Sequence, residues 1–324
     1  MKSARNGSPT GAVALALALA LVLSSAACSG SPSDGGPKNP THTATPKATP
    51  KPLGPYVALG DSYTSGPGIP DQVGEPAGCS RSSRNYPALI AQKLNLAATA
   101  VRDLSCSGAR IVDLAAPQVT TDGTNPAQLS ALSPGTALVT LGIGGNDVDF
   151  AGVLSRCVEM DVIPAMFGSK LMPDLTPCRA YYTSGGVDQL QQKIQDAAGP
   201  LATALAQIKQ RAPHARVYVI GYPALLPATG TTCADTLGIT SGDVAYLSGE
   251  ELRLNSMLRQ AAQGADATYV DTYTPSVGHD ACSAAASRWI EPLLGGSSGT
   301  PLHPNALGEQ GMADAVEHAI AAAG

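Results

Sequence analysis

The chain has 324 residues and a formal net charge of −5, and 44% of its residues are hydrophobic. These values fit a globular domain with additional segments, and an acidic balance without a basic stripe argues against nucleic acid as a partner. Phe occurs only twice and Trp once, so the core has to be built from Val, Ile, Leu and Ala, which suits buried parallel strands.

The N-terminus has the layout of a secretory signal. Two basic residues precede an uninterrupted apolar run at residues 12–23, which is shorter than the roughly 20 residues needed to span a bilayer. We therefore predict a cleaved signal peptide over residues 1–27 and an exported protein. Cys28 follows two small residues, as in the lipobox of bacterial lipoproteins. This predicts lipidation of Cys28 and anchoring to the outer face of the cell membrane, with ordinary cleavage after Ala27 as the alternative.

Residues 28–55 are dense in Pro, Thr, Ser, Gly and Lys, and Leu53 is their only large aliphatic side chain. Such a segment cannot bury enough apolar area to offset its ordering entropy. We predict a linker that its prolines keep extended, followed by a domain over residues 56–324.

From Tyr56 onward, short β-branched runs alternate with longer helix-like stretches. The candidate strands are residues 56–59, 137–141, 216–220 and 268–270, and the candidate helices are residues 87–94, 189–209 and 244–262. A last helix after Pro304 spaces Met312, Val316 and Ile320 along one face. This alternation predicts a single α/β domain with parallel strands joined by crossover helices.

Seven cysteines are present, and six remain if Cys28 carries lipid. Those six are Cys79, Cys106, Cys157, Cys178, Cys233 and Cys282. An even number in an oxidising compartment predicts three disulfides, although spacing alone does not choose their pairing. No C-x-x-C pair occurs, so neither a metal site nor a cofactor is expected.

Ser62 stands in Gly60-Asp61-Ser62-Tyr63, directly after the first candidate strand. This places it at the carboxyl end of a strand, where open α/β sheets gather their ligands. The triplet alone is also an ordinary turn sequence, so companion motifs have to decide its meaning.

A serine nucleophile needs a base near neutral pH, and the chain has five histidines. His42 lies in the linker, His214 precedes a candidate strand, and His318 lies within the last helix. His279 and His303 both occupy late loops. We favour His303, which stands directly ahead of a helix, and interpret His279 as a structural histidine beside a cysteine.

Two glycine-containing segments supply candidate donors for an oxyanion. Gly142–Asp147 closes the strongest candidate strand with a glycine turn followed by the Asn146 amide. In Ser105–Ala109, Gly108 lets a backbone N–H approach a substrate closely.

In chain order, Ser62, Gly108, Asn146 and His303 resemble the four blocks of the SGNH or GDSL hydrolase family, in particular its secreted actinobacterial esterases and lipases. The resemblance covers the chain from about Tyr56 to the C-terminus. It implies a flavodoxin-like, three-layer α/β/α sandwich around a central parallel sheet. It also implies a serine ester hydrolase in which Ser62 is the nucleophile and His303 the base. The Ser62 N–H, the Gly108 N–H and the Asn146 side chain would form the oxyanion hole.

The sequence departs from the family pattern three residues before the histidine, where many members have Asp and this chain has Thr300. We therefore predict a Ser62–His303 dyad with the Thr300 carbonyl orienting the imidazole, and Asp280 as the fallback. The resemblance also implies disulfides that join the cysteines in sequence order, namely Cys79–Cys106, Cys157–Cys178 and Cys233–Cys282.

A formal G-x-S-x-G match at Gly295–Gly299 lies in a glycine-serine loop, without the preceding strand that a nucleophile elbow requires, so we reject it. The expected substrate is an acyl ester of lipid type. The alternatives are a carbohydrate O-acetyl esterase and a catalytically silent lipoprotein that binds a surface polymer or lipid.

Overall fold

The computed structural model describes residues 53–168, 175–227, 237–294, 296 and 299–323. The predicted signal peptide, Cys28, Cys233 and nearly all of the predicted linker lie outside these ranges, as do three residues of the Gly295–Gly299 match. Within them, no helix has both the length and the apolar character needed to cross a membrane.

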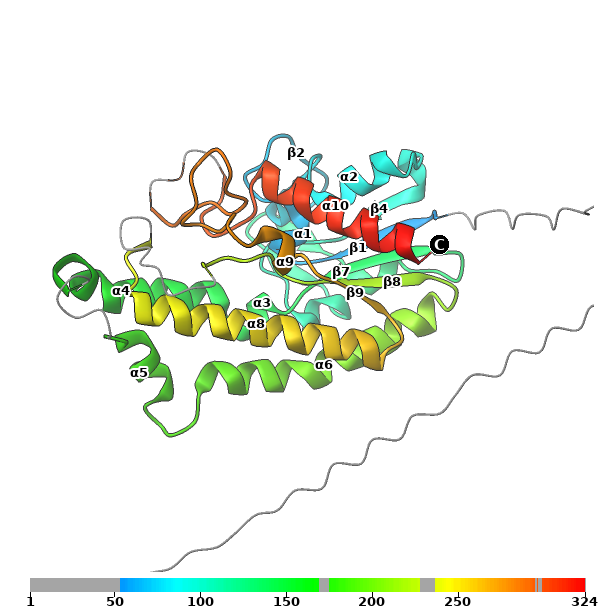
Figure 1. Ribbon diagram of the computed structural model, residues 1–324. Coiled ribbons are helices and arrows are strands. Elements are labelled where there is room, and N and C mark those ends of the chain that lie inside the picture. Colours follow the sequence, from blue (N-terminus) through cyan, green and yellow to red (C-terminus); the bar gives the residue numbers. More distant parts are fainter. Residues whose placement is uncertain (1–52, 169–174, 228–236, 295, 297–298, 324) are drawn as a thin grey trace, which may run out of the picture. The chain divides into compact units, whose positions relative to one another are not determined.

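A five-stranded sheet forms the centre of the domain (Figure 1). Its strands are β1 (Tyr56–Gly60), β4 (Val101–Asp103), β7 (Leu138–Gly142), β8 (Arg216–Ile220) and β9 (Thr268–Val270). They lie in the order β4-β1-β7-β8-β9, and every neighbouring pair is parallel. This is the doubly wound order of flavodoxin-like folds, in which the chain builds first to one side of β1 and then to the other.

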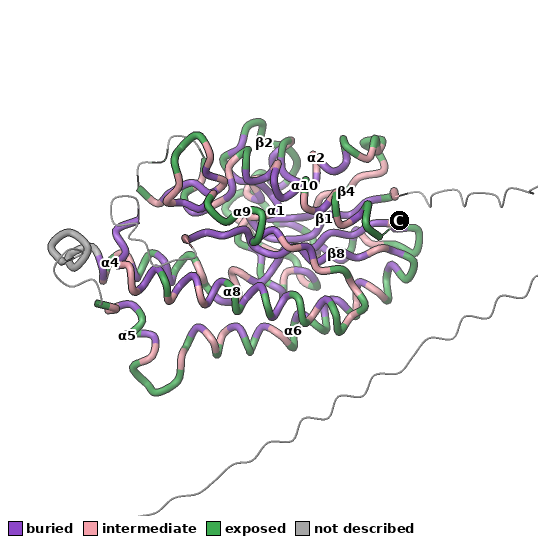
Figure 2. Tube along the Cα trace, in the orientation of Figure 1, coloured by how far each residue is buried: buried purple, intermediate pink, exposed green. Residues whose placement is uncertain are grey.

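Helices cover both faces of this sheet (Figure 1). The helices that pack on it are α2 (Tyr86–Lys93), α6 (Gln189–Arg211), α8 (Ser241–Gly264) and α10 (Ala306–Ala322). Successive side chains of a strand point to opposite faces. In β1, Val57 and Leu59 belong to the core formed with α6 and α8, whereas Tyr56 and Ala58 belong to the core formed with α2 and α10. All five β1 residues are buried (Figure 2), so the three-layer α/β/α fold is confirmed.

Further helices and strands lie in the connections between these elements. The remaining helices are α1 (Ser62–Ser65), α3 (Gly145–Val148), α4 (Phe150–Gly168), α5 (Pro177–Thr183) and α9 (Tyr273–Ser276). Two antiparallel strand pairs are β2 (Gln72–Val73) with β3 (Arg81–Ser82) and β5 (Gln118–Thr120) with β6 (Gly123–Asn125). The 3₁₀ turns are η1 (Ala77–Cys79), η2 (Ala98–Ala100), η3 (Ile111–Leu114) and η4 (Gln128–Ala131).

The predicted strands and long helices are confirmed to within three residues at each end. Met312, Val316 and Ile320 form the buried face of α10, as their spacing predicts. The sequence does not predict β4, α4 or α5. In β4 a three-residue Val-Arg-Asp segment forms the partly exposed edge of the sheet, so it lacks the apolar run that marks the central strands.

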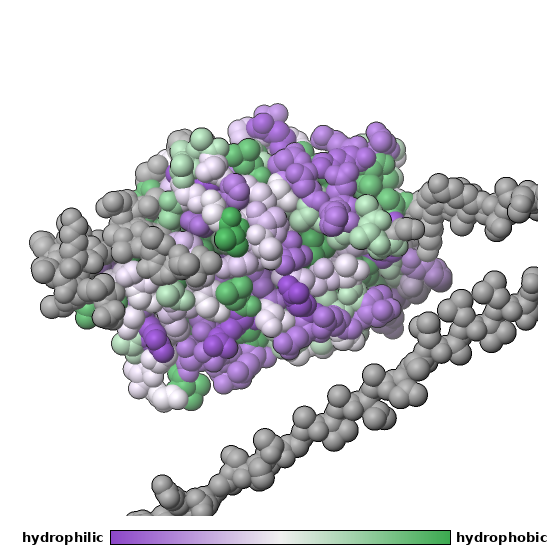
Figure 3. Space-filling view, in the orientation of Figure 1, coloured by the Kyte–Doolittle hydropathy of each residue, from purple (hydrophilic) through white to green (hydrophobic). Residues whose placement is uncertain are grey.

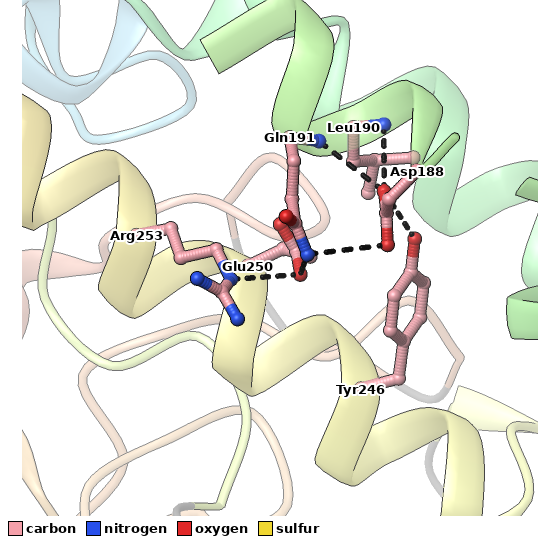
Figure 4. Close-up of polar contacts among 6 residues, drawn as sticks. All are labelled: Asp188, Leu190, Gln191, Tyr246, Glu250 and Arg253. Atoms are coloured by element: carbon pink, nitrogen blue, oxygen red, sulfur yellow. Dashed lines mark hydrogen bonds and ion pairs between the residues drawn. The ribbon is translucent and has the colours of Figure 1, made fainter. Parts of the chain in front are cut away.

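A polar cluster joins α6 to α8 (Figure 4). Asp188 caps the N-terminus of α6, and its carboxylate also accepts a hydrogen bond from the Tyr246 hydroxyl of α8, at 3.0 Å. Gln191 of α6 donates to Glu250 of α8 at 3.3 Å, and Arg253 pairs with the same carboxylate at 3.2 Å. These contacts fix α8 against α6, and α8 supplies part of the wall of the site described below.

Two of the three expected disulfides, Cys79–Cys106 and Cys157–Cys178, are present. The first joins η1 to the loop that follows β4, and the second joins α4 to α5. The pair Cys233–Cys282 stays a prediction, because Cys233 lies outside the described residues.

Candidate active site

The carboxyl ends of β1 and β7 meet at the point where the strand order reverses. Gly60 lies opposite Gly142, and the Asp61 N–H donates to the Gly142 carbonyl at 2.9 Å. A Cβ at Gly60 would lie only 2.4 Å from that carbonyl oxygen, so the two strand ends approach this closely only because the residue is glycine. Ser62 begins α1 and Gly145 begins α3 immediately beyond the two strands. Such a switch point is the usual ligand site of open α/β sheets.

Ser62 and His303 are in direct contact there. The Ser62 Oγ lies 2.8 Å from the His303 Nε2, although the two residues are 241 positions apart in the chain. Asp61 is the N-cap of α1 and accepts the Tyr63 N–H, which fixes Ser62 at the first position of the helix. Ser62 is 5% exposed. A serine hydroxyl in this position can transfer its proton to the imidazole.

The second ring nitrogen of His303 contacts the Pro301 carbonyl at 2.8 Å. A carbonyl can only accept, so Nδ1 carries the proton and Nε2 is free to accept from Ser62. The prediction that the Thr300 carbonyl orients the ring is therefore wrong by one residue. Thr300 instead accepts the backbone N–H of His303 at 3.2 Å, closing a turn in which Leu302 has a φ of 62°. That turn leaves the Pro301 carbonyl beside the ring.

The fallback residue, Asp280, does not contact this imidazole. Its carboxylate is buried and accepts the Cys282 N–H at 2.9 Å. His279 has the structural surroundings that the sequence suggested: its Nδ1 lies 2.6 Å from the Ser287 carbonyl, and its ring stacks on Trp289.

Burial changes the pKa of His303, the candidate general base. It lowers the pKa of the His303 imidazole from its ordinary value of 6.5, and the hydrogen bond to the Pro301 carbonyl opposes this change. No carboxylate contacts the ring among the described residues. The imidazole is therefore poised in its neutral form near neutral pH.

The start of α3, which carries Asn146, is tied to the loop that carries Gly108. The Asn146 side-chain amide donates one hydrogen to the Ala109 carbonyl at 2.9 Å, and its second hydrogen has no acceptor among the described residues. The neighbouring Asp147 accepts the Ile111 N–H at 3.1 Å. Gly108 has a φ of 77°, which favours glycine, and its N–H is likewise without an acceptor in the described part of the chain.

The Gly108 loop is also held from its other side. The Cys106 N–H donates to the Gly60 carbonyl, and the Ser107 N–H donates to the Cys79 carbonyl, each at 3.0 Å. The Cys79–Cys106 disulfide reinforces the second contact. The structure therefore brings the Gly108 loop beside the β1 end that precedes Ser62, as the sequence prediction requires.

Two tyrosines that the sequence analysis does not single out lie beside these residues. The Tyr222 hydroxyl accepts the Gly145 N–H at 2.8 Å and donates to Asp61 Oδ2 at 2.5 Å. The Tyr63 hydroxyl donates to the Leu302 carbonyl at 2.5 Å. Tyr222 follows β8 by two residues, so the rule that ligands gather at the carboxyl ends of strands could have identified it.

An apolar pocket opens beside the Ser62–His303 pair. Its aliphatic and aromatic walls are formed by Tyr63, Phe150, Leu154, Leu225, Leu254 and Leu302. Glu251 of α8 also lines this pocket. Both of its carboxyl oxygens accept the Leu225 N–H, at 2.9 and 3.2 Å. Burial raises the pKa of the Glu251 carboxyl well above its ordinary value.

Metal ligands do not gather anywhere in the described ranges, which contain no group of three or more His, Cys, Asp and Glu side chains suited to an ion. The chemistry available at the site is that of a hydroxyl, an imidazole and hydrogen-bond donors.

The face of the molecule shown in Figure 3 carries its apolar residues in small separate groups among polar ones.

Sequence comparison agrees with this geometry. The profile of the GDSL-like Lipase/Acylhydrolase family matches residues 58–310. The chain belongs to this family. It is therefore a carboxylic ester hydrolase, and the matched region contains all four of the residues singled out from the sequence.

Two similar proteins are lipases of one bacterium. The chain is 42% identical to Lipase 2 of Streptomyces coelicolor over 84% of its own length and 87% of that protein. Lipase 1 of the same organism is 32% identical over 79% of this chain and 82% of that protein. Among solved structures, the phospholipase A1 of Streptomyces albidoflavus NA297 superposes with a TM-score of 0.66 at 28% identity. That match covers 81% of this chain and 98% of the other.

Proposed function

We propose that the protein is an exported lipase or esterase that hydrolyses acyl esters of lipid type through a Ser62–His303 dyad. The observation that carries the proposal is the 2.8 Å contact between Ser62 Oγ and His303 Nε2 beside an apolar pocket. Membership of a lipase and acylhydrolase family supports the reaction class.

In the proposed cycle, His303 Nε2 takes the proton of Ser62 as Oγ attacks the ester carbonyl. The Pro301 carbonyl holds the imidazole in the tautomer that this step requires. The protonated ring then gives its proton to the departing alcohol, leaving an acyl group on Ser62. Water repeats the sequence, with His303 again as base, and releases the carboxylic acid.

The tetrahedral intermediate carries a negative oxygen that needs hydrogen-bond donors. The Ser62 N–H, the Gly108 N–H and the second hydrogen of the Asn146 amide are the donors we assign to it. Each of them is without an acceptor among the described residues, which leaves them free for substrate. Preorganised donors of this kind stabilise the transition state without reorganising during the reaction.

The apolar pocket favours a substrate whose acyl group has a long alkyl chain over one whose acyl group is acetyl. An alkyl chain gains about 0.8 kcal/mol for each CH₂ that it buries against apolar walls. Walls such as Phe150, Leu154 and Leu254 offer that gain, whereas an acetyl group would leave them uncovered. The lipases and the phospholipase among the relatives point to the same substrate class.

The proposal is tested by measuring hydrolysis of nitrophenyl esters of increasing chain length, beside an acetylated polysaccharide. We expect a higher kcat/KM for esters of longer acyl chains than for acetyl esters. Ser62→Ala should lose both activity and fluorophosphonate labelling. A preference for acetate would favour a carbohydrate deacetylase. A wild type that is not labelled, under conditions that label a known esterase, would favour a binding protein.

The two-residue character of the dyad has its own test. His303→Ala should abolish turnover, whereas Asp280→Ala should retain most of it, because the Asp280 carboxylate is occupied by the Cys282 N–H. An equally severe loss in both variants would show that a carboxylate does take part.

For location, we propose export by the signal peptide over residues 1–27 and lipid anchoring through Cys28, with the segment over residues 28–55 as a spacer. One of the similar solved structures is an extracellular lipase, from Streptomyces rimosus, which supports export. Mass spectrometry of the mature N-terminus in the native host tests this. A diacylated Cys28 is expected. A mature protein with an unmodified N-terminus in the culture medium would show that the protein is secreted and not anchored.

A further inference from the structure

Three of the residues assigned to catalysis, Ser62, Asn146 and His303, come from separate segments. Ser62 follows β1, Asn146 follows β7, and His303 lies in the loop before α10. An active constellation has to be held to within about 0.5 Å by its supporting contacts. What joins the three segments is therefore a functional question, and two tyrosine hydroxyls bridge them.

Tyr222 joins the first segment to the second. Its hydroxyl accepts from Gly145, the neighbour of Asn146, and donates to Asp61, the neighbour of Ser62. The fit is tight, since a Cβ placed on Gly145 would lie 3.1 Å from the Tyr222 hydroxyl oxygen. One side chain thus sets the spacing between the starts of α1 and α3, which carry Ser62 and Asn146.

Tyr222 is itself fixed to the scaffold. Its backbone N–H donates to Asn255 Oδ1 at 2.8 Å, and its carbonyl accepts from Asn255 Nδ2 at 2.9 Å. Asn255 is buried on α8. The bridge is consequently anchored in a long helix rather than in a free loop.

Tyr63 joins the first segment to the third. Its hydroxyl donates to the carbonyl of Leu302, which precedes His303, and its ring lies 5.3 Å from the imidazole. The ring of Tyr63 also meets that of Tyr222 edge-on, with centroids 5.1 Å apart. The two tyrosines are therefore in contact with one another as well as with the three segments.

We propose that Tyr222 and Tyr63 are positioning residues, whose hydroxyl groups align Asn146 and His303, respectively, with Ser62 for ester hydrolysis. This inference rests on the proposed function. Neither hydroxyl is needed to bind the acyl chain, so the loss of either should lower kcat and leave KM nearly unchanged.

The chain provides a matched control. Tyr218 lies four residues before Tyr222 and is buried, and its hydroxyl has no hydrogen-bond partner among the described residues. Tyr218→Phe therefore removes a buried tyrosine hydroxyl that bridges nothing. Purified wild type, Tyr218→Phe, Tyr222→Phe and Tyr63→Phe are compared on a soluble nitrophenyl ester and by thermal melting.

Tyr222→Phe is expected to lower kcat by about 10²-fold, the order of loss that follows a misplacement of reacting groups by about 1 Å. KM should stay within about threefold, and Tyr218→Phe should match the wild type. Because Tyr222 acts on Asn146, adding Tyr222→Phe to Asn146→Ala should cost much less than it does alone. If Tyr222→Phe does not fold, Tyr63→Phe makes the same test on the His303 side.

The inference would be overturned if Tyr222→Phe and Tyr63→Phe had the same kcat as Tyr218→Phe. It would also be overturned if Tyr222→Phe lowered kcat by the same factor in the wild type and in Asn146→Ala. In both cases the wild type remains active and the proposed function stands. A wild type that hydrolyses no ester would refute the proposed function, and this inference with it.

Discussion

Replacing Asn146 by Ala removes both hydrogens of its side-chain amide. One hydrogen is bound by the Ala109 carbonyl, and the other is the one we assign to the oxyanion. The Gly108 loop keeps its other anchors in the variant, which are the Asp147 carboxylate and the Cys79–Cys106 disulfide. The expected loss is therefore that of a single oxyanion donor, about 10²–10³ in kcat, or about 2.7–4 kcal/mol.

The assay is the steady-state hydrolysis of a soluble nitrophenyl ester, with KM and the melting temperature measured in parallel. Asn146→Asp provides a sharper version, since it keeps the size of the side chain and places an oxygen where a donor is needed. It should lose more than Asn146→Ala. Turnover of Asn146→Ala within about threefold of the wild type would refute the assignment, because a donor to the oxyanion is not removed without cost.

Three further outcomes follow from the buried titratable groups. Since burial lowers the pKa of the His303 imidazole below 6.5, kcat/KM should rise with pH through an apparent pKa below that value; a limb centred above 7 would contradict neutral His303 as the base. Burial raises the pKa of Asp61 to about 7, so between about pH 4 and 7 the folded state holds a proton that the unfolded state has lost. The melting temperature should therefore increase as the pH falls from 7 to 5, and this increase should shrink in Asp61→Asn. Glu251→Ala leaves the Leu225 N–H buried without its acceptor, which should lower the free energy of unfolding in urea by about 1–3 kcal/mol, whereas Glu251→Gln should lose less.

Much of the fold is visible in the sequence because its central strands are buried on both faces. Runs such as Arg216–Ile220 are rich in β-branched and apolar residues and need no tertiary information to be recognised. The edge strand β4 carries no such signal, because Val101 is the only apolar residue among its three. Ser62 and Asn146 were also predictable, because each closely follows the end of a strand of this kind.

The arrangement around those residues depends on contacts between distant parts of the chain. Tyr222 meets Asp61 across 161 positions, and its sequence neighbourhood contains no motif. The orienting carbonyl is misassigned to Thr300 for a different reason. The left-handed backbone of Leu302 decides which carbonyl faces the ring, and a non-glycine residue in that conformation is not foreseeable from the sequence.

The acceptor that aligns His303 is a backbone carbonyl, at Pro301, and this has a consequence for mutagenesis. Every amino acid carries such a group, so substitution of residue 301 cannot delete it, and an alanine scan would not report the loss of this acceptor. Replacing the amide bond between Pro301 and Leu302 by an ester bond would weaken the Pro301 carbonyl as an acceptor while keeping every side chain. The role of the Pro301 carbonyl in this enzyme can therefore be tested by chemical replacement of the backbone, but not by side-chain substitution.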